Sequence, residues 1–231
     1  MENTFKKHET LYCILLIVIY IISNSFCLEQ FGLTDFRMVI VNTILSLLLV
    51  LLILLLKRRE SYGLVKVKNY KDYLYFIPLV LIVSVNLWTG ININNTTTEI
   101  ICHILNMINI GFIEEIIFRG FLFKMMEKDN VKSAIIVSSI TFGIGHIVNL
   151  LNGSDLIPTL MQISYAIAVG YLFVIIFYKS KSLLPCIVAH SLTNALSIFN
   201  VDNNITMYLV PLFLVVTSIT YAIYINKKVK E

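Results

Sequence analysis

The stretch MVIVNTILSLLLVLLILLL, residues 38–56, is the clearest structural signal in the chain, because it contains no charged side chain. A helix of about 20 apolar residues is long enough to cross the hydrocarbon core of a bilayer. The rest of the 231-residue chain has a similar character, since 58% of its residues are hydrophobic and 14% are charged. Soluble domains average about 25% charged residues. The sequence therefore predicts an integral membrane protein.

Apolar runs of comparable length recur along the whole chain. The polar segments between them are short, which leaves no room for a soluble domain. We predict an all-α fold, a polytopic membrane bundle of about eight transmembrane helices. The predicted spans are Leu11–Cys27, Met38–Leu56, Tyr73–Thr89, Ile100–Phe123, Ala134–Leu151, Ile157–Tyr178, Leu183–Phe199 and Ile205–Ile225.

The basic residues indicate how these helices are oriented. Apart from Arg37 and Arg119, every Lys and Arg lies before the first span, after the second, fourth or sixth, or after the eighth. Cytoplasmic segments of membrane proteins are enriched in Lys and Arg. Both termini are therefore expected in the cytoplasm, with the protein in the cell membrane. The net charge of +4 is a topology signal, and we expect the lipid bilayer, and no nucleic acid, as a partner.

Charged residues inside a predicted span are costly, and they usually pair or serve function. The fourth span contains GFIEEIIFRG, residues 111–120. Glu115 and Arg119 are four residues apart, so they share a helix face and can form an ion pair. Glu114 is rotated from Glu115 by about 100° in a 3.6-residue helix. It therefore points elsewhere and is expected to remain a carboxylate without a partner on its own helix.

Two later spans carry further polar side chains. His146 lies in the fifth span, and His190 and Asn194 lie four residues apart on a shared face of the seventh. Counted at 1.5 Å per residue from the basic ends of their spans, Glu114 and these three residues lie about 12–21 Å deep. Because all four depths fall towards the middle of the membrane, three helices can bring these side chains to one cavity.

These residue types suit hydrolysis. A carboxylate and an imidazole can activate a water molecule, with the carboxylate as general base. A second imidazole and an amide can donate hydrogen bonds to the oxyanion that forms when this water attacks an amide carbonyl. A metal site is the alternative, since Glu114, His146 and His190 make a three-ligand set for a divalent metal such as zinc. The zinc-protease motif HExxH is absent.

Three short motifs resemble those of a known family, the CAAX-prenyl-endopeptidase-like intramembrane proteases, also called the CPBP or Abi family. The motifs are Glu114-Glu115-xxx-Arg119, Phe142-xxx-His146 and His190-xxx-Asn194. Their order and internal spacing are similar to those of the family. The resemblance implies an intramembrane endopeptidase, a hydrolase that works either as a metalloprotease or through a metal-free glutamate mechanism.

The resemblance also implies a role for each residue. Glu114 and His146 would activate the water. His190 and Asn194 would form the oxyanion hole. The pair formed by Glu115 and Arg119 would support the site.

The same resemblance suggests how the chain is organised. Residues 1–98 would hold the first three transmembrane helices, residues 99–200 a CPBP-like catalytic core with helices four to seven, and residues 201–231 the C-terminal transmembrane helix. The expected substrate is a membrane-associated peptide or protein. Prokaryotic members of the family take part in bacteriocin self-immunity or peptide processing, and the composition, rich in Ile, Asn and Lys, favours a bacterial source.

Two other functions fit parts of the pattern. A non-catalytic immunity or scaffold membrane protein would keep the fold and bind a peptide or a transporter. A proton-coupled transporter is the second alternative, because Glu and His side chains also build proton relays in membranes. We detect no internal repeat of the kind that many transporters carry.

Overall fold

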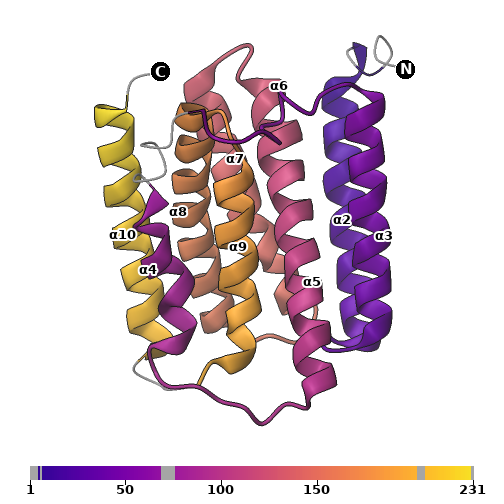
Figure 1. Cartoon of the computed structure of the whole chain (residues 1–231), viewed down its shortest axis with the longest axis vertical. Coiled ribbons are helices and arrows are strands. Elements are labelled where there is room, and N and C mark those ends of the chain that lie inside the picture. The colour runs from indigo at the N-terminus through magenta and orange to yellow at the C-terminus, as the bar shows by residue number, and fades with distance from the viewer. Residues whose placement is uncertain (1–4, 6, 69–75, 202–205, 230–231) are drawn as a thin grey trace.

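The computed structural model describes the chain except for residues 1–4, 6, 69–75, 202–205 and 230–231. The described residues form helices and no strand, and the long helices stand side by side in one bundle (Figure 1). This confirms the predicted all-α bundle. The elements are α2 (Glu9–Phe31), α3 (Phe36–Leu55), α4 (Leu79–Ser84), η2 (Val85–Leu87), α5 (Thr97–Glu115), η3 (Ile116–Phe123), α6 (Lys124–Met126), α7 (Val131–Gly145), η4 (His146–Leu150), α8 (Leu156–Ser180), α9 (Leu184–Leu196), η5 (Ser197–Phe199) and α10 (Thr206–Lys228).

Within the described residues, six helical runs are long and apolar enough to cross a membrane. They are Glu9–Phe31, Phe36–Leu55, Thr97–Met126, Val131–Leu150, Leu156–Ser180 and Met207–Lys228. The expected number was about eight. The predicted seventh span, Leu183–Phe199, is present as the apolar run Leu184–Phe199, which is shorter than the six long runs.

The third predicted span, Tyr73–Thr89, is wrong as a single long helix. Residues 73–75 lie outside the described residues, and in the remainder the helical elements are α4 and the three-residue segment η2. Pro78 stands at the N-cap of α4. Proline lacks a backbone N–H and clashes with the preceding turn, so it is tolerated at the start of a helix and breaks its interior. Hydropathy alone does not register this effect.

The ends of the helices agree with the expected topology. The N-terminal end of α2, the C-terminal ends of α3, α8 and α10, and α6 all lie at one end of the bundle, the upper end in Figure 1. The described Lys and Arg residues between the helices are next to these ends in the sequence. We call this the basic end. The segment α4 runs from the basic end towards the opposite end (Figure 1), so the alternation of the connections is kept.

The α3–α5 interface shows an inverted arrangement, with polar side chains inside and apolar ones outside. Asn42 donates to Asn106 (3.2 Å), and Ser46 donates to Asn109 (2.7 Å). The outward face of α3 is exposed and apolar, with Ile40, Ile44, Leu47, Leu48, Leu51, Leu54 and Leu55. Interhelical hydrogen bonds of this kind hold helices together in lipid, where an apolar outer face costs nothing.

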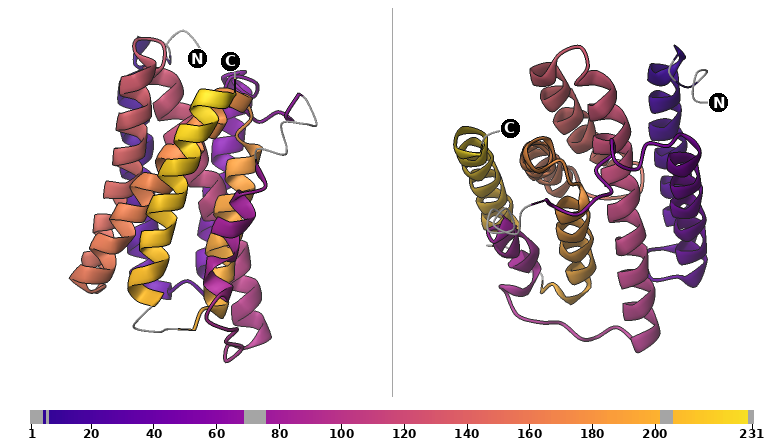
Figure 2. Two further views of the ribbon diagram at one scale, coloured as in Figure 1. Left: turned by 90° about the vertical axis from the view of Figure 1, so that its left-hand side faces the viewer. Right: turned by 45° about the horizontal axis from the view of Figure 1, so that its top comes forward.

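The centre of the bundle is formed by α5, α7, α8 and α9. Helix α8 packs against α7 and α10, and α9 packs against α5. Helices α2 and α3 stand at one edge, and α4 and α10 at the other, as Figure 2 shows in its right-hand view.

Close approach of the central helices depends on two glycines. A Cβ atom at Gly111 would lie 2.9 Å from the backbone N and Cα of Ser191, so α5 and α9 can meet only at a glycine. A Cβ atom at Gly143 would lie 2.8 Å from the backbone N of Ile167, which makes Gly143 the contact between α7 and α8. At Gly145, by contrast, no atom of a neighbouring described element lies within 4 Å of the position that a Cβ would take.

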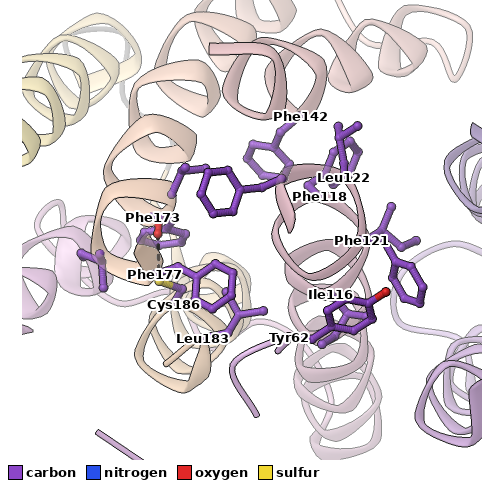
Figure 3. Packing of buried hydrophobic residues seen from close by; sticks show 14 of the residues in the cluster. Tyr62, Ile116, Phe118, Phe121, Leu122, Phe142, Phe173, Phe177, Leu183 and Cys186 are labelled. Carbon is purple, nitrogen blue, oxygen red and sulfur yellow. Dashed lines mark hydrogen bonds between the residues drawn. The ribbon is translucent and has the colours of Figure 1, made fainter. Parts of the chain in front are cut away.

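The segment η3 is a π-helix, and all eight of its residues are buried. It continues α5 without a break, and its aromatic side chains enter the core of the bundle (Figure 3). The Phe118 and Phe142 rings pack edge to face, with centroids 5.4 Å apart. Short π-helical segments occur frequently at functional sites, and this one begins directly after Glu115.

Candidate active site

The adjacent residues Glu114 and Glu115 end α5, where the helix passes into η3. One step along a helix turns the side chain by about 100°, and this step sends the two carboxylates into different surroundings. The Glu115 side chain is fully buried, whereas the Glu114 side chain is 12% exposed. The expected separation of the two glutamates is therefore present in the structure.

Glu115 belongs to what we call the buried cluster, formed by Glu115, Arg119 and the rings of Phe142 and Phe173. Glu115 Oε1 lies 3.1 Å from Arg119 Nη1, and neither side chain has any exposed surface. This confirms the predicted ion pair. The Arg119 guanidinium lies 4.2 Å from the Phe142 ring centroid and 6.0 Å from that of Phe173. Such cation–π contacts are strongest when the cation is desolvated.

His190 joins the buried cluster to Glu114. Its Nδ1 lies 2.9 Å from Glu115 Oε1, and its Nε2 lies 3.4 Å from Glu114 Oε2. The backbone contact between Gly111 and Ser191, the residue after His190, brings α9 close enough to α5 for these distances. One imidazole therefore contacts both glutamates, an arrangement that the sequence did not indicate.

Glu114 has a second partner that sequence reasoning missed. The Tyr20 hydroxyl, from α2, donates a hydrogen bond of 2.7 Å to Glu114 Oε1. Tyr20 is buried, with 6% of its surface exposed. The only sequence signal was weak: Tyr20 and Asn24 are four residues apart in an apolar helix and therefore share a face.

A cavity of about 350 Å³ lies against Glu114. We call it the Glu114 cavity. Glu114, His146, His190 and Asn194 all line it, so the four predicted catalytic residues border one space, as the depth argument expected. Their catalytic roles stay predictions. The Phe142 ring forms part of the wall and contacts both imidazoles, with centroids 5.5 Å from His146 and 5.6 Å from His190.

The Glu114 cavity extends away from the basic end. Its lining includes Leu33, in the turn between α2 and α3, and Ser197, just after α9. The turn between α2 and α3 lies at the lower end of the bundle in Figure 1. The remaining polar lining is formed by uncharged side chains, which are Asn24, Asn86, Asn149, Gln162, Tyr165 and Thr193.

Glu114, His146 and His190 are the three residues expected to hold a metal. Among the described residues, no group of three His, Cys, Asp or Glu side chains is placed to hold an ion. One ring nitrogen of His190 faces Glu115, a kind of carboxylate partner that metal-ligating imidazoles commonly have, and the other faces Glu114, which is itself one of the three expected ligands. The expected metal site stays a prediction.

A comparison with known protein families finds a match to the middle part of the chain. Residues 95–196 match the family described as type II CAAX prenyl endopeptidase Rce1-like. This part of the chain is similar to an Rce1-like domain. This is the family expected from the three motifs, and it supports a CAAX-protease-like intramembrane endopeptidase. We found no match to the chain among curated proteins.

The Rce1-like domain overlaps the predicted catalytic core, residues 99–200, and contains Glu114, His146, His190 and Asn194. Tyr20, on α2, lies outside it, and so do Asn24 of α2 and Val210 of α10, which line the Glu114 cavity. The Glu114 cavity is therefore lined both by the matched domain and by helices that the family model does not cover.

Proposed function

We propose that this protein is an intramembrane endopeptidase that hydrolyses peptide bonds of membrane-associated peptides or proteins, with Glu114 as its general base. The observation that carries the proposal is the position of Glu114, whose carboxylate borders a cavity also lined by His146 and Asn194. Carboxylate, imidazole and amide groups facing one enclosed space suit water activation and oxyanion stabilisation.

In the proposed reaction, Glu114 accepts a proton from a water molecule that His146 helps to hold. The water oxygen adds to the carbonyl carbon of the substrate and forms a tetrahedral oxyanion. The Asn194 side-chain amide donates a hydrogen bond to this oxyanion. When the intermediate collapses, the C–N bond breaks and the proton held by Glu114 passes to the leaving nitrogen.

The contacts around Glu114 favour a positioning role for two further residues. Tyr20 and His190 approach different oxygens of the Glu114 carboxylate, which fixes its orientation. Precise orientation of a reacting group contributes substantially to catalysis. His190 was expected to donate to the oxyanion, but its two nitrogens face Glu114 and Glu115, so we propose that it orients the base instead.

We further propose that the protein lies in the cell membrane with both termini in the cytoplasm. The support is the basic end of the bundle (Figure 1). The helix ends that lie next to the Lys and Arg residues of the connecting segments are at this end, and cytoplasmic segments are enriched in these residues. Bacteriocin processing or self-immunity is one setting for the activity. A peptide precursor encoded beside this chain would support that setting.

The test is cleavage of a panel of transmembrane peptides by the purified protein in liposomes, followed by mass spectrometry. Wild-type protein is expected to cut at least one peptide, and His146→Ala and Glu114→Gln are expected to lose the activity. Full activity in either variant would overturn the mechanism. Metal analysis of the same preparation, with the activity measured after chelation, decides whether a metal takes part.

A further inference from the structure

A second cavity lies beside Glu114, next to α2. Its volume is about 60 Å³, and we call it the α2 chamber. The residues that line both this chamber and the Glu114 cavity are Asn24, Glu114, Phe142, His146 and Asn149. Among the described residues, those that line the α2 chamber alone are Tyr20, Ile21, Phe118, Gly145 and Val148. The proposed general base and His146 therefore border two cavities.

The size and the lining of the α2 chamber suit water. A water molecule takes about 30 Å³ in the liquid, so the chamber has room for about two. A buried water makes about three hydrogen bonds to polar groups of the protein. The chamber offers a hydroxyl, a carboxylate, an imidazole and two carboxamides, from Tyr20, Glu114, His146, Asn24 and Asn149. A segment of peptide is too large for this volume.

Two buried polar atoms on and beside α2 have no protein partner among the described residues. One is the acceptor Asn24 Oδ1. The next residue, Ser25, donates to Asn152 Oδ1 (2.8 Å), and the donor Asn152 Nδ2 is the second of the two atoms. An unpaired polar group at membrane depth costs free energy unless a partner satisfies it. Water suits both atoms, because it donates and accepts hydrogen bonds.

Gly145 keeps the α2 chamber open. No atom of a neighbouring described element lies within 4 Å of the position that its Cβ would take. Its φ of −52° and ψ of −29° are right-handed helical values that residues with side chains also adopt. Neither the backbone nor the packing of helices therefore requires a glycine here, in contrast to Gly143. The space left by the missing side chain belongs to the chamber.

A separate space for water matters because hydrolysis consumes a water molecule for each peptide bond that is cut. A substrate that fills the Glu114 cavity displaces water from it, and the hydrocarbon core of the bilayer holds none in reserve. The α2 chamber reaches both Glu114 and His146. Water held there stays beside the base while the substrate is bound.

We propose that the α2 chamber stores the water that Glu114 activates and supplies it while a substrate occupies the Glu114 cavity. The inference rests on the proposed endopeptidase function and identifies the source of its second reactant. It makes Asn24, on α2 and outside the matched residues 95–196, a positioning residue for the stored water. It gives Gly145 the role of keeping the chamber open.

The first experiment fills the chamber in two steps, with Gly145→Ala and Gly145→Val. Gly145 is not among the described residues that line the Glu114 cavity, so substrate binding should be kept. We expect kcat for peptide cleavage in liposomes to fall at least about tenfold in Gly145→Val, and less in Gly145→Ala, with KM little changed. The matched control is Ser133→Val, which adds the same β-branched side chain at an exposed position of α7 and should change neither constant.

Two results of this experiment overturn the proposal. One is an unchanged kcat in Gly145→Val. The other is a raised KM with an unchanged kcat, because the chamber would then be part of the substrate site. If Gly145→Val does not fold, Gly145→Ala decides by the same criteria.

The second experiment detects the stored water without any cleavage. X-ray pulses convert water inside the protein into hydroxyl radicals, which label neighbouring side chains that mass spectrometry then identifies. Phe118 and Phe123 are a matched pair, since both lie in η3 and are buried, but of the two only Phe118 lines the chamber. In wild-type protein we expect Phe118 to be labelled at least about fivefold faster than Phe123, because buried waters are ordered beside it. In Gly145→Val this difference should disappear.

Equal labelling of Phe118 and Phe123 in wild-type protein overturns the inference and leaves the endopeptidase function standing. Failure of the function itself gives a different result, because wild-type protein would then cut no peptide above the Glu114→Gln background. The labelling still decides in that case whether the α2 chamber holds water.

Discussion

The buried cluster around Glu115 and the Glu114 cavity lie on two sides of the same helix end. In the buried cluster, the carboxylate is matched by a guanidinium, enclosed by aromatic rings and closed to solvent. In the cavity, the neighbouring carboxylate is held by a hydroxyl and an imidazole, and it borders open space. Two identical side chains in consecutive positions thus have different surroundings, which suit one to support structure and the other to do chemistry.

His190 is the link between the two regions. It contacts Glu115 with one nitrogen and Glu114 with the other, so the orientation of the cavity carboxylate depends on the buried ion pair. The comparison predicts that variants of the cavity lose activity and keep the fold, whereas variants of the buried cluster lose both.

The largest expected effect is that of Glu114→Gln. Loss of a general base typically costs about 10²–10⁴-fold in rate, so we expect cleavage to fall at least about 100-fold. Thermal unfolding in detergent should change little, because the amide keeps the shape of the side chain. If the unfolding temperature of Glu114→Gln fell as far as that of an Arg119 variant, the cavity and the buried cluster would not differ in their effect on stability.

Arg119→Met should act mainly on stability. It leaves Glu115 as a buried carboxylate without its guanidinium, and breaking a buried pair in this way costs about 3–5 kcal/mol. The expected result is a large drop in the unfolding temperature or in the yield of folded protein. The double variant Glu115→Gln with Arg119→Met removes both charges and should be the more stable of the two. If it is less stable than Arg119→Met alone, the pair is not the source of the effect.

Tyr20→Phe tests whether the Tyr20 hydroxyl positions the Glu114 carboxylate in the cavity. It removes only the hydroxyl that donates to Glu114, and we expect kcat to fall about tenfold, within the range for a hydrogen bond to a charged group, with KM little changed. The matched control is Tyr12→Phe on the same helix, where the side chain is exposed. Equal kinetics in the two variants would show that Tyr20 does not position the base.

The smallest effect is expected far from both regions. Thr96 and Glu99 form a capping box at the start of α5, and Thr96→Ala should cost about 1 kcal/mol of stability. Because the cap lies at the other end of α5 from Glu114, the specific activity of the folded protein should not change. A loss of activity larger than the loss of folded protein would show that the position of Glu114 depends on the whole helix.

The sequence by itself determined that this is a membrane protein, that it forms an all-α bundle with one basic end, and that Glu115 pairs with Arg119. These features follow from hydropathy, from charge counts and from the 3.6-residue helical period, all of which are local in the chain. Pro78 was also local evidence, and the third span was predicted too long because the apolar count did not weigh it.

Only the tertiary structure decided which residues contact Glu114. Tyr20 and His190 come from helices far apart in the sequence, and their contacts depend on how closely those helices pack, as at Gly111 and Ser191. The carboxamide side chains that line the Glu114 cavity also depend on tertiary packing, because they come from five different elements and follow no periodic pattern in the sequence. The periodic pattern of a helix predicts which residues share a face. Only the packing of the helices determines which of these faces line the same cavity.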